Sequence, residues 1–410
     1  MKKYVIIGGG IAGVSCIEGI RSVDPNGEVT LISAESESNY GRPLISYYLQ
    51  GKTDIPRMSW RGEDFYERMN VRALHAMTAE RVDPEGHRVV LSTGEALSYD
   101  ALCLCTGSHP FSPRFEGIET VEQRFFFTTL ADALALEAAV TPETRVLIVG
   151  AGFIGLKCAE GLRDRAGSVT VCDLAAHAMN ANLDGDASAI LERHLEKNGL
   201  RLMLGNTVTR FEGNKARMQN GETVDFDVLV IAIGVRPETS LFAGAGGKVN
   251  RGIPVNERME TALPGIWAAG DCTESLDVSC GEAGVLAVLP NASFQGRTAG
   301  VNMAGGEAVF DTGMKMNSIG FFGLHIMSAG TYTDLIYSEV TDAGCKKLFA
   351  RDGVLTGYMI VGDVGRAGIY TALIRNKTPL EELDLEALKH EPSLLPFGKV
   401  SRAKMLGGVV

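Results

Sequence analysis

The sequence predicts an α/β fold with two dinucleotide-binding units and a smaller, strand-rich C-terminal part. Two observations carry this prediction. The apolar run Tyr4–Ile7 leads directly into the glycine pattern of residues 8–13, and Val146–Val149 leads into the same pattern at residues 150–155. A buried strand that runs through G-x-G-x-x-G into a helix is the arrangement that binds a dinucleotide pyrophosphate in a Rossmann-like fold.

In the first unit, each glycine of the pattern has its own steric role. Gly8 makes the tight turn, Gly10 lets the phosphates approach the backbone, and Gly13 lets the helix pack closely on the strand. A helix predicted over residues 14–23 would offer its N-terminus to the phosphates. The second strand is predicted at residues 29–32, and Glu35 follows it where a carboxylate can accept hydrogen bonds from an adenosine ribose.

The second unit repeats the first. Gly150, Gly152 and Gly155 take the places of the three glycines above, and the shared residues extend into the helix, where Cys16, Glu18 and Gly19 recur as Cys158, Glu160 and Gly161. Residues 169–173 repeat the second strand. Two complete fingerprints in one chain predict two dinucleotides and electron transfer between them.

The second unit ends its second strand with Asp173, and no arginine follows within a dozen residues. A carboxylate at this position favours a ribose 2′-hydroxyl and repels a 2′-phosphate, so the sequence predicts NAD(H) rather than NADP(H). His177, if cationic, is an alternative partner for a phosphate. The unit closes with a buried strand at residues 228–233 that ends in Gly234.

Length and composition narrow the class of protein. The 410 residues suggest two to three domains, and the net charge of −11 argues against nucleic acid or an anionic membrane as a partner. The apolar run after Lys2 and Lys3 is too short for a signal peptide, and no run is long enough to span a bilayer. A cytoplasmic protein is therefore expected.

The eight cysteines lie mostly within apolar strand or helix patterns, and no C-x-x-C occurs. Buried, reduced thiols are therefore expected in place of disulfides or a metal site. Cys103 and Cys105 alternate along one strand, which puts both side chains on the same face.

Three further stretches are candidate cofactor contacts, each with an ordinary alternative. Arg42 is suited to a phosphate or ribose but also to a solvated loop. Thr106 and Gly107 close a predicted buried strand, and Gly270 and Asp271 close another, where the carboxylate would face flavin hydroxyls; both pairs also occur in plain turns. A helix predicted from Pro290 to about residue 304 would direct its positive N-terminus at a reduced flavin.

From about residue 310 the pattern changes to strands, predicted at residues 318–322, 326–332, 346–350 and 354–361, with a helix over residues 365–375. These elements predict a separate small α+β domain over residues 310–410. No nucleotide fingerprint falls within it, so its role is not readable from the sequence.

The ordered set of motifs resembles the FAD-dependent pyridine nucleotide-disulfide oxidoreductase superfamily. The motifs of this set are, in chain order, the glycine fingerprint, Arg42-Pro43, Thr106-Gly107, the second fingerprint, Gly234-Val235-Arg236-Pro237 and Gly270-Asp271. Residues 234–271 are most similar to the branch of NADH-dependent rubredoxin reductases, ferredoxin reductases and the flavin part of assimilatory nitrite reductases. The resemblance implies that the first fingerprint and Gly270-Asp271 bind FAD. It also implies a discontinuous FAD domain, residues 1–112 and 240–309, with an NAD domain inserted at residues 113–239.

Three departures from the family pattern affect the chemistry. The redox cysteine of the disulfide and peroxide enzymes is absent after Arg42, so thiol chemistry is not expected. Tyr47 replaces a lysine that often lies beside the flavin, and Lys157 replaces a glutamate of the NAD fingerprint. We hypothesise that Lys157 supplies the positive charge near the nicotinamide and flavin; the alternative is a helix lysine that reaches solvent.

The resulting prediction is an FAD-dependent NADH oxidoreductase without a redox-active disulfide. Hydride transfer from nicotinamide C4 to flavin N5 would be followed by single-electron transfer to a small rubredoxin- or ferredoxin-type acceptor, and the cofactors would carry the chemistry. An NADH oxidase and a non-enzymatic NADH-sensing flavoprotein are the two alternatives. No metal-ligand spacing occurs, so any iron–sulfur centre is expected in the partner.

Overall fold

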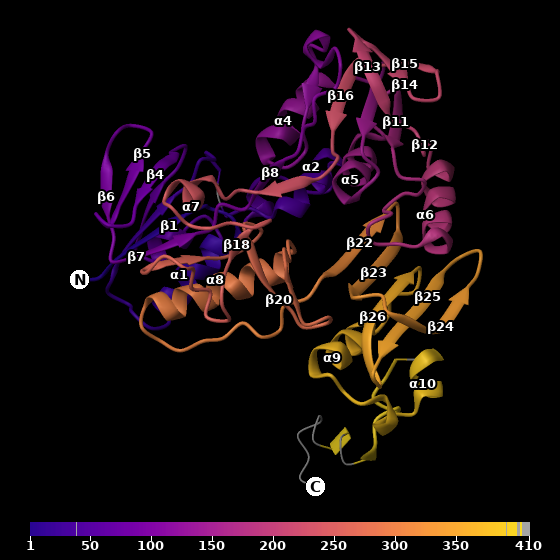
Figure 1. Cartoon of the computed structure of the whole chain (residues 1–410). Helices are drawn as coiled ribbons and strands as arrows, with labels where there is room; N and C mark the ends of the chain where they lie inside the picture. Colours follow the sequence, from indigo (N-terminus) through magenta and orange to yellow (C-terminus); the bar gives the residue numbers. More distant parts are fainter. Residues whose placement is uncertain (38, 391, 400–401, 404–410) are drawn as a thin grey trace.

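The computed structural model describes residues 1–37, 39–390, 392–399 and 402–403. Figure 1 shows the arrangement of the chain: the first unit with the N-terminus, the second unit in magenta, and the C-terminal part in gold. The α/β prediction is confirmed, because both fingerprint strands lie in parallel sheets. None of the helices in the described part of the chain combines the length and apolar character needed to cross a membrane.

The first sheet is assembled from two distant stretches of chain. Its order is β19-β7-β1-β2-β3, all parallel, with β1 (Lys3–Ile7), β2 (Glu28–Ile32), β3 (Val71–Leu74), β7 (Ala101–Leu104) and β19 (Ile266–Ala268). The chain leaves this sheet after β7 and returns to it with β19. The second sheet is built from the residues in between.

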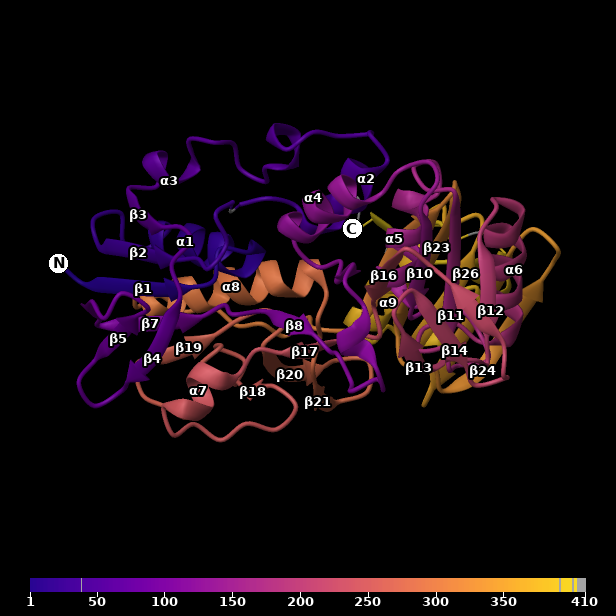
Figure 2. The ribbon, with the colours of Figure 1, turned by 90° about the horizontal axis from the view of Figure 1, so that it is seen from above.

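The two faces of the first sheet are covered differently. Helices α1 (Ile11–Arg21) and α8 (Leu289–Met303) pack on the face that carries Tyr4 and Ile6. The three-stranded sheet β4 (Ala79–Asp83), β5 (Arg88–Leu91) and β6 (Ala96–Ser98) packs on the face of Val5 and Ile7, together with α7 (Ser240–Gly244). Figure 2 shows α8 alongside the sheet, with α7 on its other side.

Helices α1 and α8 touch backbone to backbone. A Cβ added at Gly296 would collide with the carbonyl oxygen of Ala12, one at Gly300 with that of Cys16, and one at Gly19 with that of Arg297. The first helix begins at Ile11, three residues before its predicted start, because Gly10 caps it in an extended conformation. Helix α8 begins one residue before Pro290, which occupies its first turn.

The second sheet has the order β12-β11-β10-β16-β9 and is also parallel. Its strands are β9 (Arg124–Phe125), β10 (Arg145–Val149), β11 (Ser168–Asp173), β12 (Arg201–Leu204) and β16 (Val228–Ile231). Helices α4 (Leu130–Ala139), α5 (Phe153–Leu162) and α6 (Gly185–Lys197) belong to the core on one face. The meander β13 (Val208–Glu212), β14 (Lys215–Met218) and β15 (Thr223–Asp225) covers the other.

The C-terminal part is an antiparallel sheet in the order β22-β23-β26-β25-β24. Its elements are β22 (Met316–Phe321), β23 (Leu324–Gly330), β24 (Asp334–Val340), β25 (Cys345–Arg351), β26 (Val354–Val361), α9 (Gly368–Asn376) and α10 (Leu385–His390). Strand β24 is absent from the sequence prediction because its half-exposed residues lack a clear apolar alternation. The helix expected from residue 365 begins at Gly368.

This sheet joins the second unit to the rest of the C-terminal part. One face contributes Phe321, Ile326 and Met359 to the core that also contains α5 and α6. The other face packs under α9 and α10. Short connecting elements complete the described chain: α2 (Ile45–Leu49), α3 (Phe65–Arg68), β8 (Ser108–Pro110), β17 (Val235–Pro237), β18 (Ile253–Pro254), β20 (Thr273–Asp277) and β21 (Glu282–Gly284).

Candidate functional site: a cleft shared by two nucleotide-binding units

One continuous cleft of about 1820 Å³ lies against the glycine turns of both units. Twelve of the residues singled out from the sequence line it: Gly8, Gly10, Glu35, Arg42, Thr106, Gly107, Gly152, Lys157, Asp173, Gly234, Gly270 and Asp271. The other three, Gly13, Gly150 and Gly155, lie behind the lining. The structure therefore brings both fingerprints to a single site, at the carboxyl ends of the parallel strands, where open α/β sheets bind ligands.

The glycines of each fingerprint separate into two steric classes. A Cβ at Gly13 would strike the carbonyl oxygen of Gly8, and one at Gly155 that of Gly150, so these two glycines let helix and strand approach. A Cβ at Gly10 or at Gly152 would meet no protein atom within 4 Å and would instead project into open space. That empty space beside the backbone is what a pyrophosphate requires.

The N-termini of α1 and α5 have the features of an anion-binding site. Gly10 and Gly152 cap α1 and α5 in extended conformations, and neither helix receives a hydrogen bond from a side-chain cap. The first N–H groups and the positive end of each helix dipole are thus directed toward the cleft. The residues present fit two dinucleotides.

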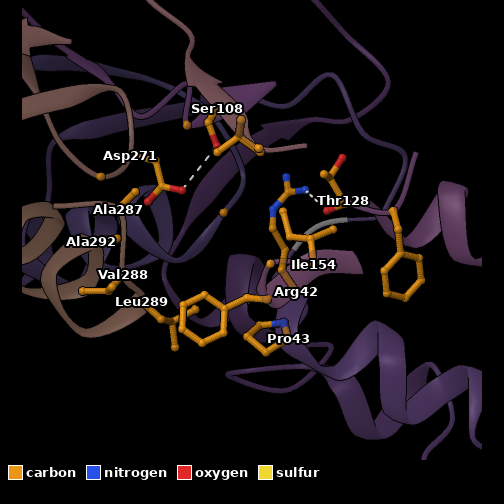
Figure 3. A pocket seen from close by; sticks show the side chains of 18 of the residues that line it. Arg42, Pro43, Ser108, Thr128, Ile154, Asp271, Ala287, Val288, Leu289 and Ala292 are labelled. Atoms are coloured by element: carbon orange, nitrogen blue, oxygen red, sulfur yellow. Dashed lines mark hydrogen bonds between the residues drawn. The ribbon is translucent and has the colours of Figure 1, made fainter. Parts of the chain in front are cut away.

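Glu35 belongs to a polar cluster at the end of the first unit. The Tyr40 hydroxyl donates to Glu35 at 2.6 Å, and Arg42 forms an ion pair with the same carboxylate. Arg42 also donates to the Thr128 carbonyl at 2.8 Å, a contact visible in Figure 3. Burial, with the charge of Glu35, raises the pKa of Tyr40, which therefore stays a neutral donor. The sequence offers a ligand contact or a solvated loop charge for Arg42; the structure shows a third arrangement, in which it pairs with Glu35 and the Thr128 carbonyl beside the cleft.

Asp173 ends β11 with its carboxylate held by backbone. It accepts hydrogen bonds from the N–H of Ala151 at 2.7 Å and of Ala175 at 2.8 Å. One of these donors lies inside the glycine turn itself, so the carboxylate is fixed beside the fingerprint. His177 lines the cleft as well, with Nδ1 3.3 Å from Glu192.

Asp271 lies across the cleft from Arg42 in Figure 3. The Ser108 hydroxyl donates to its carboxylate at 3.4 Å. Burial raises the pKa of this carboxyl, while the Ser108 hydrogen bond and the charge of Arg42 act in the opposite direction. The first turn of α8 is beside it, with Val288, Leu289 and Ala292 on the wall.

Lys157 lies near the middle of α5, where three parts of the chain meet. Its ammonium group pairs with Glu160, donates to the Gly320 carbonyl at 3.2 Å and lies 4.8 Å from the centroid of the Tyr47 ring. The two departures from the family pattern, Tyr47 and Lys157, are therefore in contact. Glu160 in turn accepts from the Phe322 N–H at 2.7 Å.

Sequence reasoning did not assign Glu160 to the site, although its i, i+3 spacing from Lys157 is a usable signal. Tyr40 and Ser108 were also missed. Both become relevant only through contacts between segments distant in sequence, which no local pattern encodes.

Most of the thiols lie away from the cleft. Seven cysteines are buried, Cys280 is exposed, and none forms a disulfide. Of the described residues that line the cleft only Cys105 is a cysteine; its sulfur lies 3.5 Å from that of Cys103, and this contact, with burial, raises its pKa well above the usual value. Within the described ranges no cluster of three or more His, Cys, Asp or Glu residues suits a metal ion.

The chain belongs to the pyridine nucleotide-disulphide oxidoreductase family, whose model matches residues 2–296. It is 32% identical over 399 residues to the NADH-dependent phenylglyoxylate dehydrogenase subunit epsilon of Aromatoleum evansii, covering 93% of each chain. It is 31% identical over 418 residues to the NADH oxidase of Methanocaldococcus jannaschii, again with 93% of each covered.

A solved structure supports the fold. The covalent putidaredoxin reductase–putidaredoxin complex contains a chain that matches with a TM-score of 0.87 at 23% identity, over 99% of this chain and 98% of that one. The fold prediction and the family resemblance are thus confirmed. The protein is an NAD(H)-dependent flavin oxidoreductase whose cofactors are FAD and NAD(H).

Proposed function

We propose that this oxidoreductase passes electrons from NADH through FAD to a small redox protein of the rubredoxin or ferredoxin type. The observation that carries the proposal is the single cleft that both fingerprints line, since it allows two bound dinucleotides to meet. The site lacks an accessible thiol, because Cys105 is buried with a raised pKa. A disulfide relay between the cofactors and the acceptor is therefore not part of the proposal.

In the proposed arrangement, residues 1–112 and 240–309 form the FAD domain and residues 113–239 the NAD domain. Gly10, Glu35 and Asp271 hold FAD, while Gly152 and Asp173 hold NADH. Bound there, the two nucleotides would supply hydride transfer and its division into single-electron steps. The protein orients both nucleotides, places two helix N-termini at their phosphates and presents the Asp173 carboxylate where a 2′-phosphate would lie.

The proposal is tested by anaerobic mixing. NADH should bleach the flavin absorbance within the enzyme's turnover time, NADPH should do so far more slowly, and added oxidised rubredoxin or ferredoxin should restore the absorbance. A flavin that NADH cannot reduce would refute the electron entry. A flavin that reduces but is reoxidised by none of these proteins would refute the acceptor class alone.

The NADH oxidase from Methanocaldococcus jannaschii favours a second candidate, in which oxygen is the acceptor. Oxygen uptake and protein reduction at equal NADH concentration separate the two. Uptake that is fast, and that an added redox protein leaves unchanged, would support the oxidase. Slow uptake suppressed by the redox protein supports the primary proposal.

We also propose that Lys157, with Glu160, sets the charge beside the reacting rings. Its support is its place in the cleft lining, in contact with Tyr47. Lys157→Met should slow hydride transfer about tenfold in stopped-flow measurements and lower the flavin midpoint potential, because a positive charge stabilises the reduced flavin. Unchanged values of both quantities would remove the hypothesis.

A further inference from the structure

The shared cleft extends beyond the two nucleotide-binding units into the C-terminal part. There its wall is formed by β22, β23, β26 and α9, through Met316, Ser318, Met327, Tyr358 and Thr371. We call this region the C-terminal lobe. It contains no glycine fingerprint, so nothing in the proposed binding of FAD and NADH accounts for its side chains.

The walls of the C-terminal lobe combine apolar contact with paired hydroxyl groups. Met316 and Met327 are half-buried thioethers that belong to the core under α9. The Tyr358 and Thr371 hydroxyl oxygens lie 2.8 Å apart, and the tyrosine is buried, with 1% of its surface exposed. One of the two hydroxyl hydrogens forms the hydrogen bond between Tyr358 and Thr371. Neither hydroxyl has another hydrogen-bond partner in the described chain, so the second hydrogen is available to an acceptor in the lobe.

A positively charged side chain, Arg375, lies behind the residues that line the C-terminal lobe. The Arg375 side chain has a buried Nε without a hydrogen-bond partner among the described residues, and its Nη2 lies 3.9 Å from the Met316 sulfur. Burial raises the pKa of Tyr358 by more than the positive charge of Arg375 lowers it. The phenol therefore keeps its hydrogen and remains a donor. A buried guanidinium N–H left unpaired is costly.

Donors thus exceed acceptors at this end of the cleft, beside one positive charge and two thioethers. We propose that the C-terminal lobe is a separate binding site for a small carboxylate with an apolar body. The carboxylate would accept from the hydroxyl pair, the positive charge of Arg375 behind Met316 would favour it through space, and its body would lie against Met316 and Met327. The cleft, about 1820 Å³ in all, extends past both glycine turns into this lobe.

The test uses the oxidised, FAD-loaded full-length protein and benzoate as the probe. Calorimetric titration and perturbation of the flavin spectrum should show saturable binding, and benzyl alcohol, which has the same body without the charge, should bind at least tenfold more weakly. NADH should not compete. Absent binding, equal binding of the alcohol, or competition with NADH would each overturn the proposal.

Substitutions in the C-terminal lobe test whether benzoate binds there. Arg375→Gln should raise its Kd about tenfold or more, and Tyr358→Phe several-fold. Arg351→Gln on β25 and Tyr337→Phe on β24 are matched controls outside the lobe and should leave the Kd unchanged. If Arg375→Gln does not fold, Thr371→Val carries the test in its place, and Arg375→Lys, which keeps the charge, should bind benzoate nearly as well as the parent protein. Unchanged Kd in the other lobe variants refutes the site, while flavin reduction by NADH, measured in parallel, reports on the proposed function separately.

Discussion

The two nucleotide-binding units share a fingerprint but differ in what surrounds it. In the first unit, α1 lies against α8 with backbone on backbone, and Glu35 is already engaged by Arg42 and Tyr40. In the second, α5 lies against Leu49 and Ser46 of α2 at longer distances, and within the described part of the chain Asp173 accepts from backbone N–H groups alone. The difference teaches that the glycine pattern specifies the phosphate site, whereas the neighbouring elements decide how firmly that site is enclosed.

The largest expected effect comes from the helix contacts. Gly296→Ala forces a methyl group into the Ala12 backbone, so unfolding should become easier by about 3 kcal/mol and bound flavin should be lost. Gly161→Ala on α5 places its Cβ 3.1 Å from a Leu49 side-chain atom, which can yield, and 3.3 Å from the Ser46 carbonyl oxygen, a much milder approach than at Gly296. Its cost should be below about 1 kcal/mol, because alanine also favours the helix. Denaturant titration and the flavin-to-protein absorbance ratio measure both; equal effects would contradict the comparison.

The second effect separates the phosphate sites. Gly10→Ala and Gly152→Ala each project a methyl group into open cleft, so neither should strain the fold, and the flavin-free forms of both variants should melt at the temperature of the flavin-free parent protein. We expect Gly10→Ala to lose FAD and Gly152→Ala to keep it while the Kd for NADH rises at least tenfold, about 1.4 kcal/mol. Flavin loss from Gly152→Ala would reverse the assignment of the two units.

The third effect concerns the acids. Asp173→Asn should raise the Kd for NADH about tenfold and narrow the preference over NADPH, because the ribose loses an ionised acceptor and the 2′-phosphate loses a repulsive charge. Glu35→Gln is the control, since it alters the first unit only and should leave the NADH-to-NADPH ratio as it is. Initial rates of flavin reduction with each nucleotide provide the measurement.

The smallest effect tests how the second unit is joined to the C-terminal sheet. Lys347 on β25 donates to Asp184 at 2.5 Å and Asp186 at 2.6 Å, and this hydrogen bond lowers the pKa of Asp186. A carboxyl with a lowered folded pKa contributes stability above its unfolded pKa, about 4, and loses it as pH falls through the folded value. Lys347→Met should therefore lower the melting temperature slightly at pH 7, and the difference should vanish in acid. A melting-temperature difference between variant and parent that is the same at pH 7 and in acid would show that the ion pair of Lys347 does not stabilise the fold.

The sequence predicts the parts of the fold that rest on local patterns. The fingerprint strands, helix α8 with Pro290 in its first turn, and four of the five C-terminal strands are periodic or carry terminal signals. Strand β24 escapes because it lies at a sheet edge with a mostly exposed face. The close contact of α1 with α8 could not be foreseen, since its glycines lie almost three hundred residues apart.

The site divides in the same way. Twelve of the fifteen chosen residues line the cleft because the glycine pattern and strand ends have fixed geometry in this fold. Tyr40, Ser108 and the C-terminal lobe escape because they face the cleft only after three separate parts of the chain have packed. Arg42 shows the limit most clearly: its sequence context allowed a ligand or solvent, and the fold pairs it with Glu35.

The burial of the thiols bears on the working lifetime of the enzyme. A reduced flavin that leaks electrons to oxygen generates hydrogen peroxide next to its own protein, and cysteines are damaged in proportion to their thiolate character and exposure. Burial raises the pKa of Cys158 and Cys272, the latter to about 12, and keeps them from solvent. Among the thiols, peroxide from stray turnovers should therefore react first with Cys280, which is exposed and outside the cleft lining.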